Sequence, residues 1–289
     1  MRGRGLAGLH PGVCGAYFLA VLGVTVTTFH PVLLALSLAC GLVWGRRLGC
    51  RFHPAALAAA GAAAAAVNPL FSHRGSTILG YFPGGNPLTL ESILFGCGAA
   101  LMLLSAVVWC ACLSRVMTAD RWMCLLGRGA PVLSLLLSMI LRFVPRFRRR
   151  LGEIRATRRA IGRAPAGGPL HRAAGGMREL SILFTWSLEG AVDTGDSMRA
   201  RGYGLPGRSS YTTWRLEGRD RAALALIAGA AGYLLLMGLR GALDWRYYPS
   251  VAWGGLDLWS LSALAVWLGV CAAPIWLERR EKRAWKSAG

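Results

Sequence analysis

Lysine is almost absent from this sequence, and acidic residues are scarce. The chain has 33 basic residues against 13 acidic ones, and its lysines are Lys282 and Lys286 alone. A Walker-type phosphate-binding loop needs a Gly-Lys-Ser/Thr step, because its lysine holds the nucleotide phosphates. Neither lysine follows a glycine, so the sequence excludes a P-loop ATPase within this chain.

The sequence also lacks the cysteine and histidine spacings of a metal site. Its eight cysteines lie mostly in apolar runs and form no CxxC pair, so we expect small buried hydrophobic residues. The histidines are scattered over different loops: His10, His30, His53, His73 and His171. We therefore expect neither a metal nor another cofactor. A membrane enzyme ranks last among the function classes, because it needs convergent catalytic groups.

Apolar and basic residues are abundant instead, with 54% hydrophobic residues and a formal net charge of +20. Long apolar runs with few charges are candidate transmembrane helices. Six occur, at roughly 13–29, 31–45, 54–70, 89–114, 222–240 and 255–277, the second and third being short or alanine-rich. The run at 130–145 is not counted, because Arg142 interrupts it and Pro145 ends it. The first run leads directly into the second, so we expect a retained span rather than a cleaved signal peptide.

The distribution of basic residues predicts the topology. Cytoplasmic segments carry an excess of Lys and Arg, and with both termini inside, all 33 basic residues except Arg74, Arg240 and Arg246 lie on the cytoplasmic side. We expect three regions: residues 1–114 with four spans, 115–221 in the cytoplasm or at the membrane surface, and 222–289 with two spans and a basic tail. The predicted fold is an all-α polytopic membrane protein with about six spans.

The predicted outer segments, 71–88 and 241–254, have the composition of loops. Aromatic residues of the second suit an interfacial belt: Trp245, Tyr247, Tyr248 and Trp253. Glu91 and Asp257 fall at the predicted outer ends of spans, where a carboxylate can reach water, and we expect a structural or solvated role for each.

The long middle segment predicts two helical stretches. The first runs from Pro131 to about Phe143 and turns at Pro145 into an arginine-rich stretch. The second runs from Met177 to about Arg201, and 162–176 is a Gly/Pro/Ala-rich joint. Apolar residues recur every four positions along the second and form one stripe: Leu180, Phe184, Leu188 and Val192. We expect the apolar sides to meet each other and the spans, while the basic ends bind anionic lipid or an acidic protein partner.

Three elements of the chain resemble one family. The segment Asp193–Gly204, with Ala200-Arg-Gly202 inside it, resembles the Ala-Arg-Gly motif of the transmembrane T component of energy-coupling factor (ECF) transporters, the EcfT/CbiQ family. Leu141-Arg-Phe-Val-Pro145 resembles that family's Leu-Arg-Phe-Ile/Val-Pro element. Segments 68–75 and 89–92 are similar to one EcfT-like branch. The three elements occur in the family's order.

The resemblance implies a coupling subunit of an ATP-driven importer for a vitamin or a transition-metal ion in a bacterial cell membrane. Two ABC-type ATPase subunits would bind two coupling helices of this chain, and a separate S component would capture the substrate. The chain itself would be non-catalytic, which agrees with its missing P-loop. The bilayer is the remaining partner, and nucleic acid is not expected.

The docking residues follow from the same resemblance. Arg201, between Ala200 and Gly202, would make forked bonds to carboxylates of an ATPase. The first motif aligns with Ala160-Ile161-Gly162, where isoleucine replaces the usual arginine. Either a neighbouring arginine, Arg158 or Arg159, supplies the contact, or this end docks through apolar contact and the two ends are unequal. Arg142 and Pro145 are the expected structural hinge.

Two other interpretations compete with this one. Arg201 sits where a basic side chain simply complements a helix dipole, followed by helix-stopping residues. A scaffold that binds anionic lipid through the basic segment, without ATPases, is the second function class. It predicts arginines spread along exposed faces with interleaved aromatics for stacking, whereas the arginines here gather at helix ends.

Overall fold

The structure is a computed structural model that describes residues 5–72, 75–81, 87–129, 131–162, 168–206, 216–253 and 257–287. Contacts divide the chain into two units. The membrane unit comprises Met1–Arg121 and Trp214–Gly289, and the crossed-helix unit comprises Trp122–Thr213. The predicted middle region, 115–221, encloses the second unit, and the two predicted membrane regions belong to the first.

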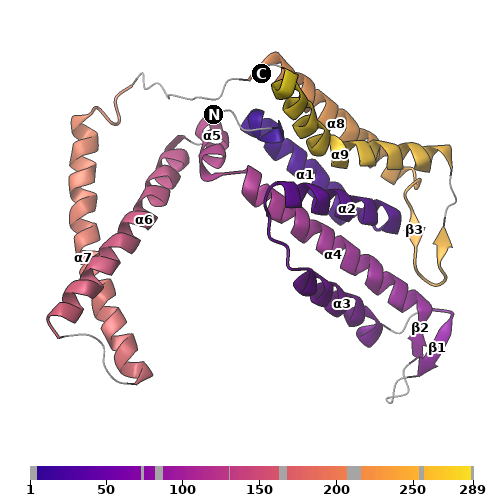
Figure 1. The fold of residues 1–289 in the computed structure, drawn as a ribbon, viewed down its shortest axis with the longest axis horizontal. Helices are drawn as coiled ribbons and strands as arrows, with labels where there is room; N and C mark the ends of the chain where they lie inside the picture. The colour runs from indigo at the N-terminus through magenta and orange to yellow at the C-terminus, as the bar shows by residue number, and fades with distance from the viewer. Residues whose placement is uncertain are drawn as a thin grey trace. The chain divides into compact units, whose positions relative to one another are not determined.

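The membrane unit is built from helices (Figure 1). After a short 3-10 helix, η1 (Gly5–Gly8), its long described helices are α1 (Pro11–Thr27), α2 (Pro31–Arg47), α3 (Pro54–Phe71), α4 (Leu90–Val116), α8 (Gly218–Leu239) and α9 (Leu258–Ser287). Three of them begin at a proline, whose missing N–H costs nothing in a first helical turn and whose fixed φ suits the helix.

Four of these helices are candidate membrane spans, so the six predicted spans are shown in part. Helices α3, α4, α8 and residues Leu258–Arg280 of α9 are long and apolar enough to cross a membrane. Helices α1 and α2 have 17 residues each, a few short of the roughly 20 that span a bilayer core. The chain is therefore an all-α, multi-pass membrane protein, as predicted.

An aromatic cluster forms the centre of the membrane unit. Tyr17 and Phe18 of α1 meet Trp44 of α2 and Trp109 of α4, with ring centroids 5.5 to 6.4 Å apart. All four side chains are buried. Edge-to-face and stacked pairs at such distances add to the free energy gained by burial, so this cluster ties α1, α2 and α4 together.

Ser37 of α2 connects the buried polar groups of the same region. Its Oγ accepts hydrogen bonds from Ser105 Oγ at 2.9 Å and from Trp109 Nε1 at 2.9 Å. Trp267 of α9 donates its Nε1–H to the carbonyl of Leu33 at 3.1 Å. Polar groups buried away from water need such partners, and these bonds fix α4 and α9 against α2.

Helix α3 packs on α4 through small residues. At Gly61 an added Cβ would lie 2.9 Å from Leu104, and at Gly96 it would overlap the backbone carbonyl of Ala65. Small residues at a contact let two membrane helices approach closely, which maximises van der Waals packing where no hydrophobic effect acts between them. The alanine-rich α3 is therefore held by close approach to α4.

Both connections from the membrane unit to the rest of the chain are fixed at the start of α1. Buried Asp220 of α8 accepts the backbone N–H of His10 at 3.2 Å and that of Glu217 at 3.1 Å. Buried Arg121 donates to Cys14 Sγ at 3.6 Å. The chain therefore leaves this unit and returns to it at anchored points.

The predicted outer segments contain short β-ribbons rather than loops alone. Strand β1 (Ile78–Tyr81) pairs antiparallel with β2 (Pro87–Thr89), and β3 (Trp245–Arg246) pairs with β4 (Ala252–Trp253). The N–H of Ser76 donates to the carbonyl of Pro249 at 3.2 Å and joins the two segments. His73 and Arg74, part of the motif at 68–75, lie outside the described residues.

Of the structural and solvated roles expected for Glu91, the structure shows the structural one. Its side chain is buried, with 2% of the residue exposed. Its carboxylate accepts hydrogen bonds from Ser76 Oγ at 3.0 Å and from Thr77 Oγ1 at 2.8 Å. The carboxylate is thus solvated by hydroxyl groups of the preceding segment, which it fastens to the first turn of α4. Asp257, by contrast, is exposed.

The predicted aromatic belt at 241–254 is wrong for Tyr247, which is buried. Its hydroxyl donates to the carbonyl of Phe29 at 3.1 Å, and its ring lies 5.5 Å from that of Phe95. Burial raises the pKa of Tyr247 to about 12. The tyrosine packs inside the unit because α4 offers an aromatic partner that the sequence does not reveal.

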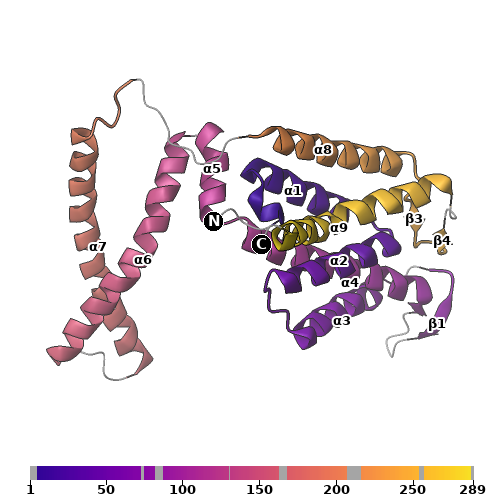
Figure 2. The same cartoon turned by 45° about the horizontal axis from the view of Figure 1, so that its top comes forward.

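The crossed-helix unit contains α6 (Pro131–Ala160) and α7 (Pro169–Ala200), preceded by α5 (Ala119–Gly129), which spans the unit boundary. Helices α6 and α7 cross in both views (Figures 1 and 2). The expected turn at Pro145 is wrong, because α6 continues through it. An interior proline removes one hydrogen bond and costs about 3 kcal/mol, and tertiary contacts can outweigh that local preference.

The joint between the two helices is shorter than predicted. Helix α7 begins at Pro169, so residues 169–176 are helical rather than part of a linker. Pro169 explains the difference, because proline at the first helical position favours the start of a helix. The glycine-rich composition of residues 169–176 would otherwise disfavour one. Residues 163–167 lie outside the described part.

Candidate docking site

The two helices of the crossed-helix unit end in the same way. Helix α6 ends at Ala160 and α7 at Ala200, and each is followed by one further residue and then a glycine. The glycines, Gly162 and Gly202, have φ values of 70° and 79°. Ile161 and Arg201 therefore occupy equivalent positions in the structure, as the alignment of the two motifs predicted.

Hydrogen bonds explain why the helices stop there. At α7 the N–H of Gly202 donates to the carbonyl of Arg199 at 2.9 Å, and the next N–H donates to Met198 at 3.0 Å. This pair is the Schellman pattern, which satisfies carbonyls that the last helical turn leaves free. At α6 the N–H of Gly162 makes the corresponding bond to Arg159 at 3.1 Å. Only glycine takes the left-handed conformation at little cost, so each Ala-x-Gly sequence fixes its helix end.

The residues of both ends face solvent within the unit. Arg201, Ala200, Arg159 and Ala160 are exposed, and Ile161 is 61% exposed. The Arg201 guanidinium makes no hydrogen bond or ion pair with any described residue, so it is available for a carboxylate of a partner. Arg201 also lies where a positive charge complements the dipole of α7. The geometry therefore agrees both with a docking role and with a purely stabilising role at the helix end.

The structure separates the two arginines considered as substitutes at the α6 end. Arg158 donates to the carbonyl of Gly175 at 2.7 Å and to Glu179 at 3.3 Å, and its side chain is only 13% exposed. It is held in the contact between α6 and α7. Arg159 remains at the surface beside Ile161.

Glu179 is a residue that the sequence reasoning missed. It is buried, and it also accepts a bond from Arg155 Nε at 2.9 Å. Gly175 and Glu179 are the buried residues of α7. Their spacing of four, continued by half-buried Leu183, marks the face that meets α6. One signal in the sequence could have indicated this contact: Glu179 is an acidic residue on a helix that pairs with an arginine-rich helix.

A second contact between the helices surrounds Trp186. The guanidinium groups of Arg146 and Arg150 lie 4.9 and 5.3 Å from the centroid of the indole ring. Phe147 meets the same ring edge-on at 6.2 Å. Arginine over an aromatic face is favourable, so cation–π and ring contacts hold α6 to α7 here.

The apolar stripe of α7 does not pack against α6 as expected. Leu180, Phe184, Leu188 and Val192 are 54% to 65% exposed, because the face of Gly175 and Glu179 makes the contact instead. The first residues of the stripe border an open groove of about 440 Å³, lined by these side chains: Phe147, Met177, Leu180, Ser181, Leu183, Phe184 and Ser187.

Helix α6 also carries exposed apolar residues before Pro145: Val132, Leu133, Leu136, Ile140, Leu141 and Val144. Extensive exposed apolar surface marks contact with a membrane or a protein partner. Arg142 and Pro145, the expected hinge, are exposed within the continuous helix, and the hinge role stays a prediction.

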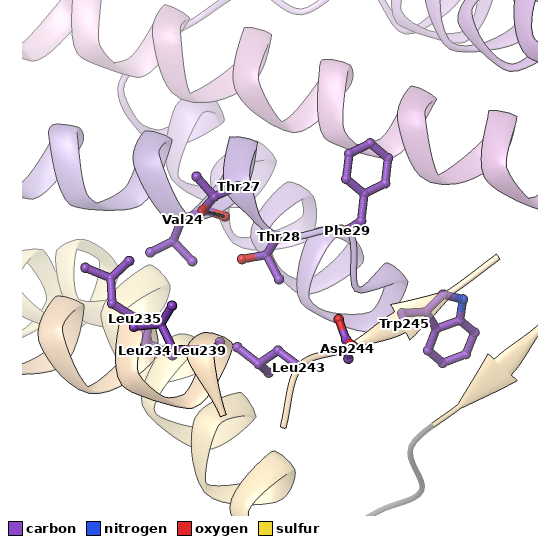
Figure 3. Close-up of a pocket in the computed structure, with 11 residues that line it drawn as sticks. Val24, Thr27, Thr28, Phe29, Leu234, Leu235, Leu239, Leu243, Asp244 and Trp245 are labelled. Carbon is purple, nitrogen blue, oxygen red and sulfur yellow. Dashed lines mark hydrogen bonds between the residues drawn. The ribbon is translucent and has the colours of Figure 1, made fainter. Parts of the chain in front are cut away.

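A half-open cavity of about 310 Å³ lies in the membrane unit between α1 and α8 (Figure 3). Val24 and Thr27 face Leu234 and Leu235 across it, and Asp244 lies near its rim. Asp244 is exposed and lies 3.5 Å from Arg246. Among the described lining residues, one carboxylate stands beside aliphatic and hydroxyl groups.

Within the described ranges, no three His, Cys, Asp or Glu side chains come together as a metal site. No protein-family model matches the chain, and no curated protein matches it. The features of the described residues that bear on function are therefore the helix ends, the charges and the exposed surfaces.

Proposed function

We propose that this chain is the transmembrane coupling subunit, or T component, of an ECF-type importer. In this proposal two cytoplasmic ABC-type ATPases dock on the ends of α6 and α7, and the chain relays their ATP-driven movement to a substrate-binding S component. The substrate is a vitamin or a transition-metal ion. The chain performs no catalysis.

The observation that carries the proposal is the matched pair of helix ends. Two helices outside the membrane unit stop at the same Ala-x-Gly step, with the same glycine conformation and an exposed side chain between. Two equivalent ends on one chain suit a partner that is present twice. The missing P-loop in this chain agrees with ATP hydrolysis on other subunits.

The two ends are unequal in chemistry. Arg201 presents a planar fork of donors that matches a carboxylate. Ile161 presents only apolar surface, with Arg159 beside it, while Arg158 is engaged with Glu179. We infer that the α7 end binds its ATPase through an ion pair and the α6 end through apolar contact, with Arg159 at its edge.

The apolar flanks of both helices support a position at the membrane. Exposed residues of α6 before Pro145 and the stripe of α7 would lie against lipid or the S component, since water is a poor neighbour for them. With both termini cytoplasmic, the crossed-helix unit lies at the inner face of a bacterial cell membrane.

A specific observation also favours the second candidate, a lipid-binding scaffold. Arg146, Arg148, Arg149 and Arg150 follow the apolar part of α6 directly, as in basic clusters that adjoin a membrane-embedded helix and bind anionic lipid. Two of them, Arg146 and Arg150, are engaged with Trp186. The basic band therefore serves the helix contact as well, and the matched ends have no role in this scheme.

Replacement of Arg201 by glutamate tests the proposed function. Breaking a charge pair at an interface costs about 2–5 kcal/mol, so ATPase recovery with the tagged, membrane-purified chain should fall about tenfold or more. Arg199→Glu, an exposed arginine two residues earlier on α7, is the matched control and should retain the ATPases. Normal membrane insertion with unchanged ATPase recovery in Arg201→Glu would contradict the proposal. Absence of ATPases from the unaltered, membrane-purified chain would favour the lipid scaffold.

A further inference from the structure

Helices α6 and α7 are joined along a seam rather than at one point. The contacts pair Arg158 with Gly175, Arg155 with Glu179, and Arg150 with Trp186. The residue numbers rise on one helix as they fall on the other, so the helices run antiparallel across their contact. The seam covers about three turns of each helix.

Two separate attachments make up this seam. The first is the Glu179 pin, in which the buried carboxylate is bound by Arg155 at 2.9 Å and Arg158 at 3.3 Å. The second is the Trp186 contact with Arg146 and Arg150. Glu179 and Trp186 are seven residues apart, or about 10 Å along the helix axis.

Two attachments at this separation restrict motion more than one does. A single contact lets two helices rotate about it like scissors, whereas two contacts about 10 Å apart fix the crossing angle. The pin resists sliding as well, because separation would leave a buried carboxylate without partners, which is strongly unfavourable.

The docking ends lie at very different distances from this seam. Ile161 follows Arg158 by three residues, less than one turn. Arg201 lies fifteen residues beyond Trp186, at the end of an arm of about 22 Å. Residues of this arm are exposed or half-buried, so it is long and carries no further attachment to α6 among the described residues.

We propose that the Glu179 pin and the Trp186 contact make α6 and α7 one rigid brace, with Glu179 as the positioning residue that fixes the two docking ends relative to each other. Movement of either end is thereby carried to the other without a change in crossing angle. The mechanical role rests on the proposed function, whereas the rigidity is a property of this chain alone.

Distance measurement by electron spin resonance tests the brace. Spin-labelled non-natural residues at positions 138 and 196 leave the eight cysteines in place, and both positions are exposed. Each label is seventeen residues from the pin, so a change of about 10° in crossing angle moves the labels by about 4 Å. The purified full chain should give one narrow distance distribution.

Variants of the attachments decide the outcome. Glu179→Gln should broaden the distribution by several ångströms, and adding Trp186→Leu should broaden it further. Glu189→Gln, an exposed residue of the same helix, is the matched control and should change nothing. A broad distribution in the unaltered chain, or a narrow one in Glu179→Gln, would overturn the brace.

Two further measurements address misfolding of the variant and coupling to the ATPases. If Glu179→Gln does not accumulate, Trp186→Leu alone decides: broadening supports two attachments, and an unchanged width overturns them. In the complex with the ATPases, adding ATP should leave the 138–196 distance unchanged, and a shift would contradict rigid transmission. The first measurements need no ATPase, so failure of the brace is distinct from failure of the proposed function.

Discussion

The membrane unit and the crossed-helix unit solve opposite problems. In the first, the large aromatic side chains Tyr17, Trp44 and Trp109 are buried, and Ser37 and Glu91 find partners inside. In the second, the described buried residues on α7 are Gly175 and Glu179, and most large apolar side chains face outward. One unit buries its large side chains, and the other leaves most of its apolar surface exposed.

Buried polar groups have different roles in the two units. In the membrane unit they satisfy one another and lock helices together. In the crossed-helix unit a polar pin and cation–π contacts replace an apolar core, so α6 and α7 hold each other while their apolar faces stay free. A substitution should therefore disturb stability in the first unit and assembly in the second.

The largest effect should come from Trp109→Ala. Loss of a fully buried tryptophan creates a cavity and removes a donor to Ser37, which should lower the free energy of unfolding by about 3–5 kcal/mol. Thermal unfolding in detergent measures it. Trp276→Ala, an exposed tryptophan on α9, should change stability by less than about 0.5 kcal/mol, and equal effects would contradict the buried aromatic cluster.

Two carboxylates at outer span ends give the next comparison. Glu91→Gln removes a charged acceptor from three donor groups of Ser76 and Thr77, which should cost about 1–3 kcal/mol of stability. Asp257→Asn changes an exposed carboxylate and should be nearly neutral. The same unfolding assay separates them, and a neutral Glu91→Gln would mean that the carboxylate does not anchor this segment.

Glycine at the end of α7 should matter more than glycine inside it. Gly202→Ala forces an L-residue to a φ of 79°, which costs about 1–2 kcal/mol, and should reduce ATPase recovery by misplacing Arg201. Gly190→Ala meets no atom within 4 Å and should stabilise α7 by up to about 1 kcal/mol. Helix content and ATPase recovery measure both. Full recovery in Gly202→Ala would show that the helix end is not the docking element.

The smallest effect should follow Ile161→Arg. This change supplies the arginine that the family motif usually has, at a position equivalent to Arg201, so ATPase recovery should not fall. Recovery of the complex from membranes is the measurement. A clear loss would show that Ile161 does not occupy the place of the family's usual arginine and that the alignment of the first motif is wrong.

Sequence periodicity predicted much of the fold, because apolar runs and prolines at helix starts are local signals. The runs at 54–70 and 89–114 correspond to α3 and α4, and Pro31 and Pro54 begin helices. Pro145 misled, because a proline inside a helix costs about 3 kcal/mol and tertiary contacts can outweigh that local preference. The burial of Glu91 and Tyr247 does not follow from their own segments, because it depends on Thr77 for the first and on distant Phe29 for the second.

The candidate site was predictable in its ends and not in its middle. A glycine that directly follows a helix can take a positive φ and end the helix, and this signal is local in sequence. The helix ends near Ile161 and Arg201 can therefore be predicted from their Ala-x-Gly sequences. The assignment of Arg158 to Glu179 depends on which face of α7 meets α6. The apolar stripe pointed to the wrong face, since the more hydrophobic side need not pack when a membrane or a partner covers it.

Site-specific photo-cross-linking in native membranes tests the central claim most directly. Photoreactive residues would replace Ile161 and Leu205 at the two helix ends, and Leu188 on the exposed stripe as a comparison. The account predicts cross-links from positions 161 and 205 to polypeptides that contain a Walker-type P-loop, and from position 188 to lipid or a small membrane protein. Absence of P-loop polypeptides at both helix ends would contradict it.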